Sequence, residues 1–394
     1  MVFRYSRLDL FFTCLGLFLF LLDLVLDMKV AVGFYQEGSF WCLGILLLFL
    51  GGSSVLVQLY SWLFYSYDPP PTNRRSEVEQ RVSPWLLKLL HVLQMGIYLR
   101  NAGVLVTSIK GCWNRNEDLK DLAVYLSYDL SILRIVETFS ESAPQLVLML
   151  TVILQQGVPD IMTVMKALVS AAAIAFSMTT YHRSLRSFLQ NKNQQTPWSS
   201  LVYFSWNVLL VSARLAALTL FSSVLPCFIF THFLCSWMMF FFFAWRLQTS
   251  FMDSASGEWL YRATVGLIWY FNWFNVVDGR TIYKSLAYHG FILVDISVLC
   301  GVWYWRMSSE PPHYVIPHLH IVITAASVVG FYIMGLLLKL VYYRWFHPTL
   351  SSDQLKGAVT EVVPDEVDSR AFSTEERSAP CNKRMRQLAQ NFYT

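Results

Sequence analysis

Residues 8–33 read LDLFFTCLGLFLFLLDLVLDMKVAVG, an apolar run long enough to cross a membrane. Three aspartates interrupt it: Asp9, Asp23 and Asp27. At about 100° per helical residue, their carboxylates fall within roughly 40° of one face and span about 27 Å of helix rise, close to the thickness of the hydrocarbon core. We therefore expect a membrane helix with a ladder of acids, which inside a membrane is generally functional. The alternative is that Asp9 merely extends to the lipid headgroups.

The composition indicates a membrane protein. Of 394 residues, 55% are hydrophobic and only 14% are charged, and the mean hydropathy is +0.43. These values are too apolar for a soluble protein, and the chain is too long for a single anchor. The net charge of +4 is small, so no nucleic-acid partner is expected. Residues 8–26 contain internal acids and lack a small-residue cleavage site, which indicates a retained span. We predict an all-α polytopic membrane protein.

Basic residues between the apolar runs predict the topology, because cytoplasmic loops carry an excess of Lys and Arg. Arg4 and Arg7 place the amino terminus in the cytoplasm. Both flanks of 86–107 are basic, and 258–277 repeats this pattern, so these two helices are expected to be partially inserted. The other eight are expected to be spanning helices. In order, the apolar runs are 8–33, 39–66, 86–107, 125–155, 160–182, 199–222, 226–248, 258–277, 287–305 and 317–343.

The chain divides into two membrane halves and a tail. Residues 1–190 and 191–348 each start and finish in the cytoplasm, which predicts two parallel pseudo-repeats, a common plan for membrane transport proteins. Residues 349–394 are polar and have few large hydrophobic side chains, so we expect a cytosolic regulatory tail. Both termini are thus predicted to be cytoplasmic.

A second polar ladder is predicted in the fourth apolar run. Arg134, Glu137, Glu141 and Gln145 recur at i, i+3, i+7 and i+11, so a regular helix places them on one stripe within about 80°. A lone charge at the bilayer centre costs ~3 kcal/mol or more, which favours pairing between helices. These charges form either static contacts between helices or a hydrophilic route, and we favour the route. Further charges within apolar runs or near their ends are Arg100, Arg183, Arg214 and Asp295.

Enzyme motifs are missing from the sequence. It contains no Gly-rich phosphate loop, no nucleophile elbow, no His-Glu-x-x-His and no Walker elements. The seven cysteines are scattered without metal-ligand spacing. We therefore expect no catalytic residue, no cofactor and no metal.

The tail carries a protease recognition sequence. Asp365, Glu366, Val367 and Asp368 are followed by Ser369 and match the sequence that executioner caspases prefer. The polar composition around them predicts an exposed segment that a protease can bind. The sequence therefore predicts an executioner caspase as a partner and cleavage after Asp368.

Four runs give the chain a family resemblance. They are DLSILRIVETFSESAPQ at 129–145, EWLYR at 258–262, WFNVVDGR at 273–280 and VYYRWFHP at 341–348. With these runs, nearly the whole chain resembles the XK-related membrane proteins. Relatives that share the caspase-type tail are phospholipid scramblases, which expose phosphatidylserine on apoptotic cells after the tail is removed. The resemblance implies the same activity at the plasma membrane, with the same eight spanning and two partially inserted helices.

The resemblance also implies roles for individual residues. A gate of the outer leaflet falls on Trp41, whereas Thr180 stands where the family pattern has an acid, which leaves the partner of Arg183 open. A single-span immunoglobulin-type subunit, such as basigin or neuroplastin, is implied as a further partner. The lipid pathway falls on Asp9, Asp23, Asp27, Arg100, Glu137, Glu141, Arg183, Arg214 and Asp295.

The sequence thus predicts an ATP-independent phospholipid scramblase that its own tail holds closed. The first alternative is a secondary transporter or channel that uses the same polar ladder to bind a small solute. The second is a scaffold for another membrane protein, which would not need the acids of the ladder.

Overall fold

The computed structural model describes residues 5–67, 75–114, 117–157, 161–188, 195–247, 249–276, 282–309 and 317–347. Within these ranges the regular secondary structure is helical, which confirms the all-α fold. The helices are α1 (Arg7–Gln36), α2 (Phe40–Tyr67), α3 (Glu77–Gln80), α4 (Pro84–Val92), α5 (Gly96–Asn114), α6 (Glu117–Glu137), η1 (Thr138–Ser142), α7 (Ala143–Gln156), α8 (Ile161–Phe188), α9 (Pro197–Val224), α10 (Phe228–Arg246), α11 (Ala255–Phe271), α12 (Ile282–Ser309), α13 (His318–Val341) and η2 (Tyr342–Phe346).

Six of these helices are long and apolar enough to cross a membrane: α1, α2, α9, α10, α12 and α13. The other two predicted spans are α6–η1–α7 and α8. They are long, since the 28 residues of α8 rise about 42 Å, but both carry several charged or small polar side chains. A polytopic membrane protein is therefore confirmed, while the number of eight crossings and the division into two repeats remain predictions.

The segment 86–107 is two helices, which corrects the expectation of one. Helix α4 ends in a Schellman motif, in which Met95 N–H donates to Leu90 O at 2.8 Å and Gln94 N–H donates to His91 O at 3.2 Å. This motif needs a left-handed residue, and Gln94 adopts it with φ of 63°. The chain therefore turns before α5 begins. The Ser54 hydroxyl of α2 donates to Gln94 Oε1 at 2.7 Å and thereby ties the turn to α2.

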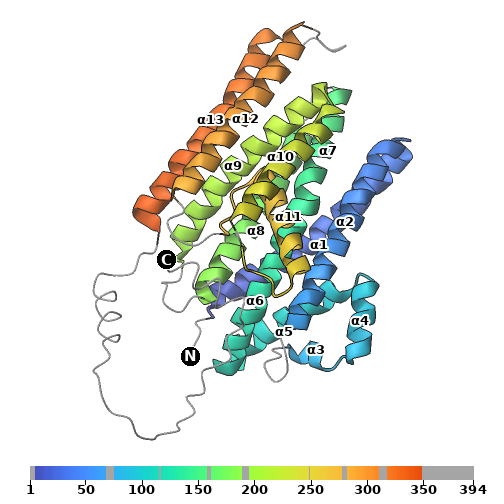
Figure 1. Cartoon of the computed structure of the whole chain (residues 1–394), viewed down its shortest axis with the longest axis vertical. Coiled ribbons are helices and arrows are strands. Elements are labelled where there is room, and N and C mark those ends of the chain that lie inside the picture. Colours follow the sequence, from blue (N-terminus) through green and yellow to red (C-terminus); the bar gives the residue numbers. More distant parts are fainter. Residues whose placement is uncertain are drawn as a thin grey trace, which may run out of the picture.

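Helix α9 forms the centre of the bundle (Figure 1). It contacts α7, α8, α12 and α13, and 67% of its most apolar stretch is buried. The α12–α13 hairpin lies along one edge in Figure 1 and the α1–α2 pair along the opposite edge. Only 6% of the corresponding stretch of α1 is buried. Helix α1 is therefore a peripheral helix that presents most of its side chains to the surroundings.

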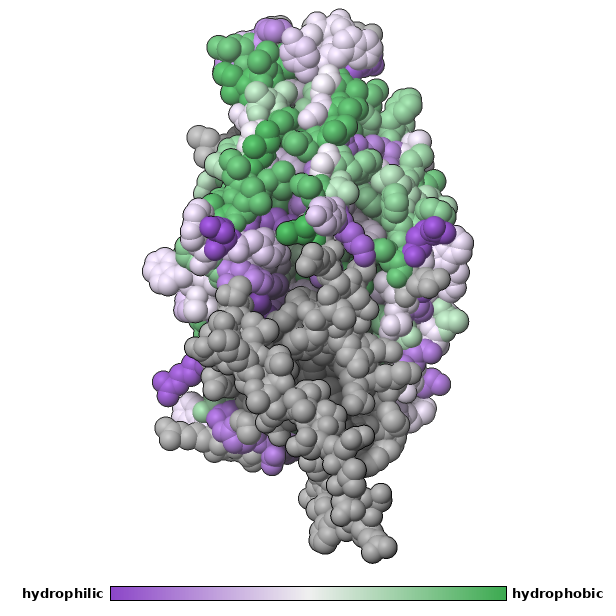
Figure 2. Space-filling model, turned by 60° about the vertical axis from the view of Figure 1, so that its left-hand side comes forward, coloured by the Kyte–Doolittle hydropathy of each residue, from purple (hydrophilic) through white to green (hydrophobic). Residues whose placement is uncertain are grey.

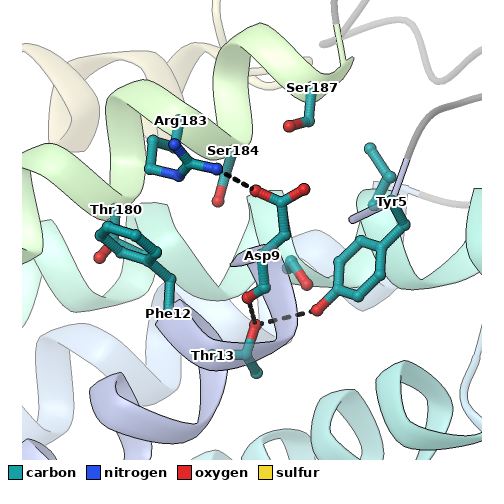
Figure 3. Close-up of a pocket in the computed structure, with 10 residues that line it drawn as sticks. Tyr5, Asp9, Phe12, Thr13, Thr180, Arg183, Ser184 and Ser187 are labelled. Atoms are coloured by element: carbon teal, nitrogen blue, oxygen red, sulfur yellow. Dashed lines mark hydrogen bonds and ion pairs between the residues drawn. The ribbon is translucent and has the colours of Figure 1, made fainter. Parts of the chain in front are cut away.

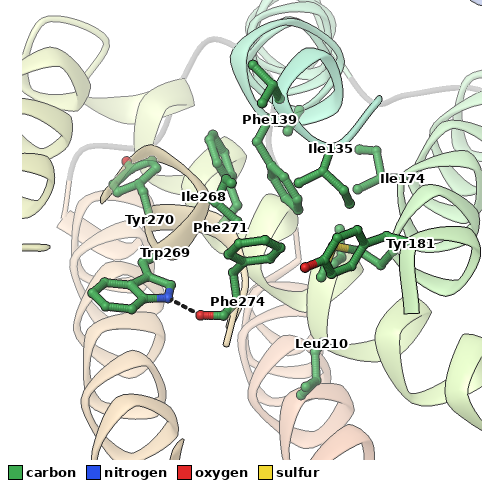
Figure 4. Close-up of a cluster of buried hydrophobic side chains, with 14 of the residues drawn as sticks. Ile135, Phe139, Ile174, Tyr181, Leu210, Ile268, Trp269, Tyr270, Phe271 and Phe274 are labelled. Carbon is green, nitrogen blue, oxygen red and sulfur yellow. Dashed lines mark hydrogen bonds between the residues drawn. The ribbon is translucent and has the colours of Figure 1, made fainter. Parts of the chain in front are cut away.

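A cluster of aromatic and aliphatic side chains joins the two predicted halves (Figure 4). Phe139 of η1 stacks on Phe271 of α11 at a ring distance of 6.0 Å, and Tyr181 of α8 lies 5.2 Å from Phe274. Trp269 Nε1 donates to Phe274 O at 2.7 Å, which closes the chain after α11 against the cluster. Outside this core, Figure 2 shows one face on which hydrophobic side chains cover much of the upper part, with hydrophilic ones along the lower border of that region. This arrangement suits a lipid-facing surface.

Candidate functional site

The first charged contact joins the start of α1 to the end of α8. Arg183 Nη2 donates to Asp9 Oδ1 at 2.7 Å, and the two side chains are only 6% and 11% exposed. The other Asp9 oxygen accepts from the Ser6 backbone N–H at 3.0 Å and from the Ser6 hydroxyl at 2.7 Å. The Asp9 backbone N–H donates to the Ser6 hydroxyl at 3.2 Å, and together with the bond from the Ser6 N–H this forms a capping box that begins α1. Asp9 thus fixes the helix start and neutralises Arg183 at once.

A small hydroxyl-rich pocket opens beside this ion pair (Figure 3). It holds about 320 Å³ of free space, counting its open mouth. Hydroxyl and charged groups outnumber apolar ones in its wall, so the pocket can hydrogen-bond a polar group that enters from the surface. Its lining residues are Tyr5, Asp9, Phe12, Thr13, Val124, Ser127, Thr180, Arg183, Ser184 and Ser187.

The pocket answers the question that the family resemblance left open. Thr180 replaces the acid expected beside Arg183, and the structure places Asp9 there as the partner. Thr180 lines the same pocket, and its hydroxyl has no hydrogen-bond partner among the described residues. The charge of Arg183 is therefore balanced by a residue 174 positions away in the sequence.

The second group of contacts surrounds the middle of α1. Asp23 Oδ2 accepts from the Ser142 hydroxyl at 2.8 Å, and Asp27 Oδ1 accepts from Gln145 Nε2. The Asp27 carboxyl also interacts with Asp23, Glu137 and Glu141. Four predicted pathway acids thus lie together between α1 and the η1–α7 segment.

Arg134 supplies a positive charge beside these acids. Its Nη1 donates to Glu137 Oε2 at 2.9 Å and its Nη2 donates to Asn101 Oδ1 at 2.9 Å. The guanidinium lies over the Phe20 ring, 3.6 Å from the centroid. The side chains of Arg134 and Glu137 are 15% and 16% exposed, so this group is only partly enclosed.

A π-helical turn places Glu141 in this group. The sequence predicted a regular α-helix over 125–155, whereas the structure has the π-helix η1 at Thr138–Ser142. Pro144 supplies the physical reason, because it has no N–H to donate to the carbonyl of Ser140 in an α-helical pattern. Such π turns often occur at functional sites. Here the turn brings Ser140 to Ser53 of α2, with 2.8 Å between the hydroxyl oxygens.

Arg100 lies apart from these acids and is enclosed. Its Nη1 is 3.5 Å from Asp129 Oδ2, and both side chains are only 3% exposed. Its Nε donates to the Ser61 hydroxyl at 3.2 Å, and the guanidinium lies 4.2 Å from the centre of the Tyr65 ring. Asp129 was absent from the predicted site, although it begins one of the family runs. The pair ties α5 to α6.

Arg214 and Asp295 form the charged centre of the second half. Arg214 Nη1 donates to Asp295 Oδ2 at 2.5 Å, and Arg214 Nε donates to Tyr270 O at 3.0 Å. His232 of α10 places its Nε2 3.1 Å from Asp295 Oδ1 and its Nδ1 3.0 Å from the Tyr270 hydroxyl oxygen. His232 was missed in the sequence, although a lone histidine within an apolar run was a signal for it.

Polar residues of α2 were missed as well. Ser54, Gln58 and Ser61 recur at i, i+4 and i+7, a helical spacing that could have revealed a polar stripe. Ser54 bonds to the α4–α5 turn, as described above, and Ser61 Oγ lies 3.0 Å from His91 Nε2. Gln58 is buried, and neither its amide nitrogen nor its amide oxygen has a partner in the described part of the chain. The first half is thus more polar inside than the two ladders alone indicated.

The remaining predictions concern Trp41, the caspase sequence and metal binding. Trp41, the predicted gate, is the second residue of α2 and is 88% exposed. The caspase sequence Asp365–Ser369 lies outside the described residues. No group of three or more His, Cys, Asp or Glu side chains in the described ranges is placed to hold a metal ion.

Comparison with known proteins gives one consistent result. A family model of XK-related proteins matches residues 11–348. The chain is 41% identical over 402 residues to XK-related protein 8 of Tetraodon nigroviridis, covering 100% of this chain and 98% of the relative. It is 38% identical to XK-related protein 8 of Gasterosteus aculeatus, with 99% and 98% covered. It is 36% identical to XK-related protein 8 of Pan troglodytes, with 98% and 94% covered.

Proposed function

The chain belongs to the XK-related family, and we propose that it is an ATP-independent phospholipid scramblase of the plasma membrane that exposes phosphatidylserine on apoptotic cells. One observation carries the proposal. The three acids of α1 contact three different elements, through Arg183 of α8, Ser142 of η1 and Gln145 of α7. Because they span about 27 Å of helix rise, the polar contacts form a seam about as tall as the hydrocarbon core.

The seam lies on the side of α1 that contacts its neighbours, and most of the rest of α1 is exposed. A lipid headgroup that leaves the interface loses its hydration, and this cost opposes transfer between leaflets. Carboxylates, hydroxyls and an arginine along one side of α1 offer replacement hydrogen bonds to the headgroup. The acyl chains stay in the surrounding lipid, since little of α1 is buried.

The tail is proposed to be the switch. Cleavage by an executioner caspase after Asp368 releases residues 369–394. Release shifts the resting equilibrium if the tail binds the closed state more tightly than the open state. A single-span immunoglobulin-type subunit, such as basigin or neuroplastin, is proposed to accompany the chain, with Trp41 limiting entry from the outer leaflet.

Reconstitution tests the proposal directly. The purified full-length protein is placed in liposomes that carry a fluorescent lipid, cut with an executioner caspase, and exposed to a reductant that cannot cross the membrane. We expect bleaching beyond the outer-leaflet half only after cleavage, and none beyond half for Asp368→Ala treated in the same way. Bleaching that stops at half in the cut protein would refute scrambling. Uptake of a polar solute in its place would favour a transporter, and neither activity would favour a scaffold.

A further inference from the structure

The root of the tail is held inside the bundle by a buried tyrosine. Tyr342 begins η2 at the end of α13, and it is fully buried. Its ring lies 5.4 Å from that of Tyr203 on α9 and 6.5 Å from that of His182 on α8. Its hydroxyl accepts from Gln195 Nε2 at 2.9 Å. The last residues before the tail are therefore packed against the junction of the two predicted halves.

Gln195 connects this tyrosine to the pocket beside α1. While its side chain bonds Tyr342, its backbone oxygen accepts from Arg183 Nη1 at 3.1 Å. The same nitrogen donates to the Ser200 hydroxyl at 2.7 Å. The other terminal nitrogen of Arg183 donates to Asp9, as Figure 3 shows. A continuous chain of hydrogen bonds thus runs from the tail root through Gln195 and Arg183 to α1.

Arg183 retains capacity for another ligand. It is 95% buried, and its Nε has no hydrogen-bond partner among the described residues. The hydroxyl of Thr180, in the same pocket, is also unpaired there. A buried guanidinium with a free donor favours an anionic acceptor, and phosphate oxygens match its geometry.

We propose that Gln195 is a positioning residue that couples the tail root to the pocket. While Tyr342 is seated, Gln195 holds the Arg183 guanidinium against Asp9, so that it does not turn to a lipid at the mouth of the pocket. After the tail is cut, Tyr342 shifts, Gln195 loses its bond, and Arg183 turns toward the phosphodiester of an entering lipid. This coupling rests on the proposed scramblase function and specifies how the pathway is regulated.

The coupling is tested in uncut, full-length protein in liposomes with the fluorescent-lipid assay. Tyr342→Phe removes only the acceptor hydroxyl and leaves the buried Gln195 Nε2 without this partner. We expect the basal scrambling rate to rise about fivefold to tenfold, the change that corresponds to one buried hydrogen bond. Gln195→Met removes the donor of the same bond, together with the Oε1 that accepts from the Ser200 hydroxyl at 3.4 Å, and should give at least the same rise. Tyr332→Phe is the matched control, since it removes a buried hydroxyl that bonds His289 elsewhere in the bundle.

Combined variants and cleavage separate the outcomes. Because both changes break the Tyr342–Gln195 bond, Tyr342→Phe combined with Gln195→Met should raise the uncut rate no further than Gln195→Met alone. After caspase treatment, the variants and the wild type should scramble at the same rate. An unchanged uncut rate in both single variants, with cleavage still activating the wild type, would overturn the coupling and leave the scramblase function intact. An equal rise for Tyr332→Phe, or a rise that persists after cleavage, would overturn it as well. A cut wild type that does not scramble would refute the proposed function itself.

Discussion

Replacing Asp9 by Asn tests whether the ion pair at the start of α1 holds the first helix in place. The change keeps the size and a hydrogen-bond acceptor but removes the negative charge that faces Arg183 at 2.7 Å. Removing one partner of a buried ion pair costs about 3–5 kcal/mol, because the other charge is left uncompensated. Arg183 keeps its bonds to Gln195 and Ser200, and Asn still accepts a bond. We therefore expect a loss at or below the lower end, about 2–3 kcal/mol.

The same carboxylate also caps α1, so the cap needs its own control. Ser6→Ala removes the cap hydroxyl, whose loss costs about 1 kcal/mol, and leaves the Asp9–Arg183 pair intact. Thermal unfolding in one detergent, followed by the fluorescence of the chain's tryptophans, ranks the variants. We expect Asp9→Asn to lower the midpoint at least twice as far as Ser6→Ala. An equal or smaller fall would mean that Asp9 acts as a cap and contributes little through Arg183.

A double-mutant cycle isolates the pair. Arg183→Met leaves Asp9 without its cation, and the combined Asp9→Asn, Arg183→Met variant leaves no unpaired charge at this position. The combined loss should fall short of the sum of the single losses by about 1–3 kcal/mol, as residues in contact do. Additive losses would refute a direct interaction between the two side chains.

Three other variants test separate parts of the molecule. Glu141→Gln should slow scrambling by the cut protein about tenfold if its charge serves the lipid route. Glu117→Gln, the same change at an exposed ion pair, should have no effect. Equal rates for both variants would remove Glu141 from the pathway. Trp41→Ala should speed outer-leaflet entry in cut protein and leave the basal rate of uncut protein unchanged. An unchanged rate in cut protein would refute the gate. Gly103→Ala places a methyl group against the hydroxyl of Ser76, which caps α3, and should cost about 1–3 kcal/mol in thermal unfolding. Gly52→Ala, with nothing within 4 Å, should not destabilise. Equal midpoints would contradict tight α3–α5 packing.

The spacing of charged residues selected the candidate side chains but could not identify their partners. Helical periodicity alone placed Asp9, Asp23 and Asp27 on one face, since it depends only on local geometry. Pairing depends on tertiary packing: Arg183 could have met any acid at its depth, and the structure gives it Asp9. The same limit explains His232, whose neighbour Asp295 lies 63 residues away. A charge within an apolar run shows that a partner is needed, and only the fold shows which one.

Local geometry failed at two places for different reasons. Pro144 was visible in the sequence, and its missing N–H explains the π turn, so a closer reading of the hydrogen-bond pattern could have predicted η1. Gln94 gave no such signal, because a left-handed residue at the end of a helix is usually Gly or Asn. Its conformation depends on the fit of α4 and α5 against α2, which a local pattern cannot contain.

The two predicted halves differ in how they use charge, and this difference favours α1 as the side where lipid moves. In the second half, α9 carries no acid, and its Arg214 is 1% exposed and bonds Asp295 and the Tyr270 carbonyl. That arrangement stabilises a central helix that is packed on several sides. In the first half, α1 carries three acids, contacts its neighbours on one side and exposes the rest. A headgroup that follows α1 meets polar side chains at successive depths, whereas one that follows α9 meets packed side chains. For the proposed scramblase, we therefore place the path along the acids of α1, with the packed helices around α9 as its support.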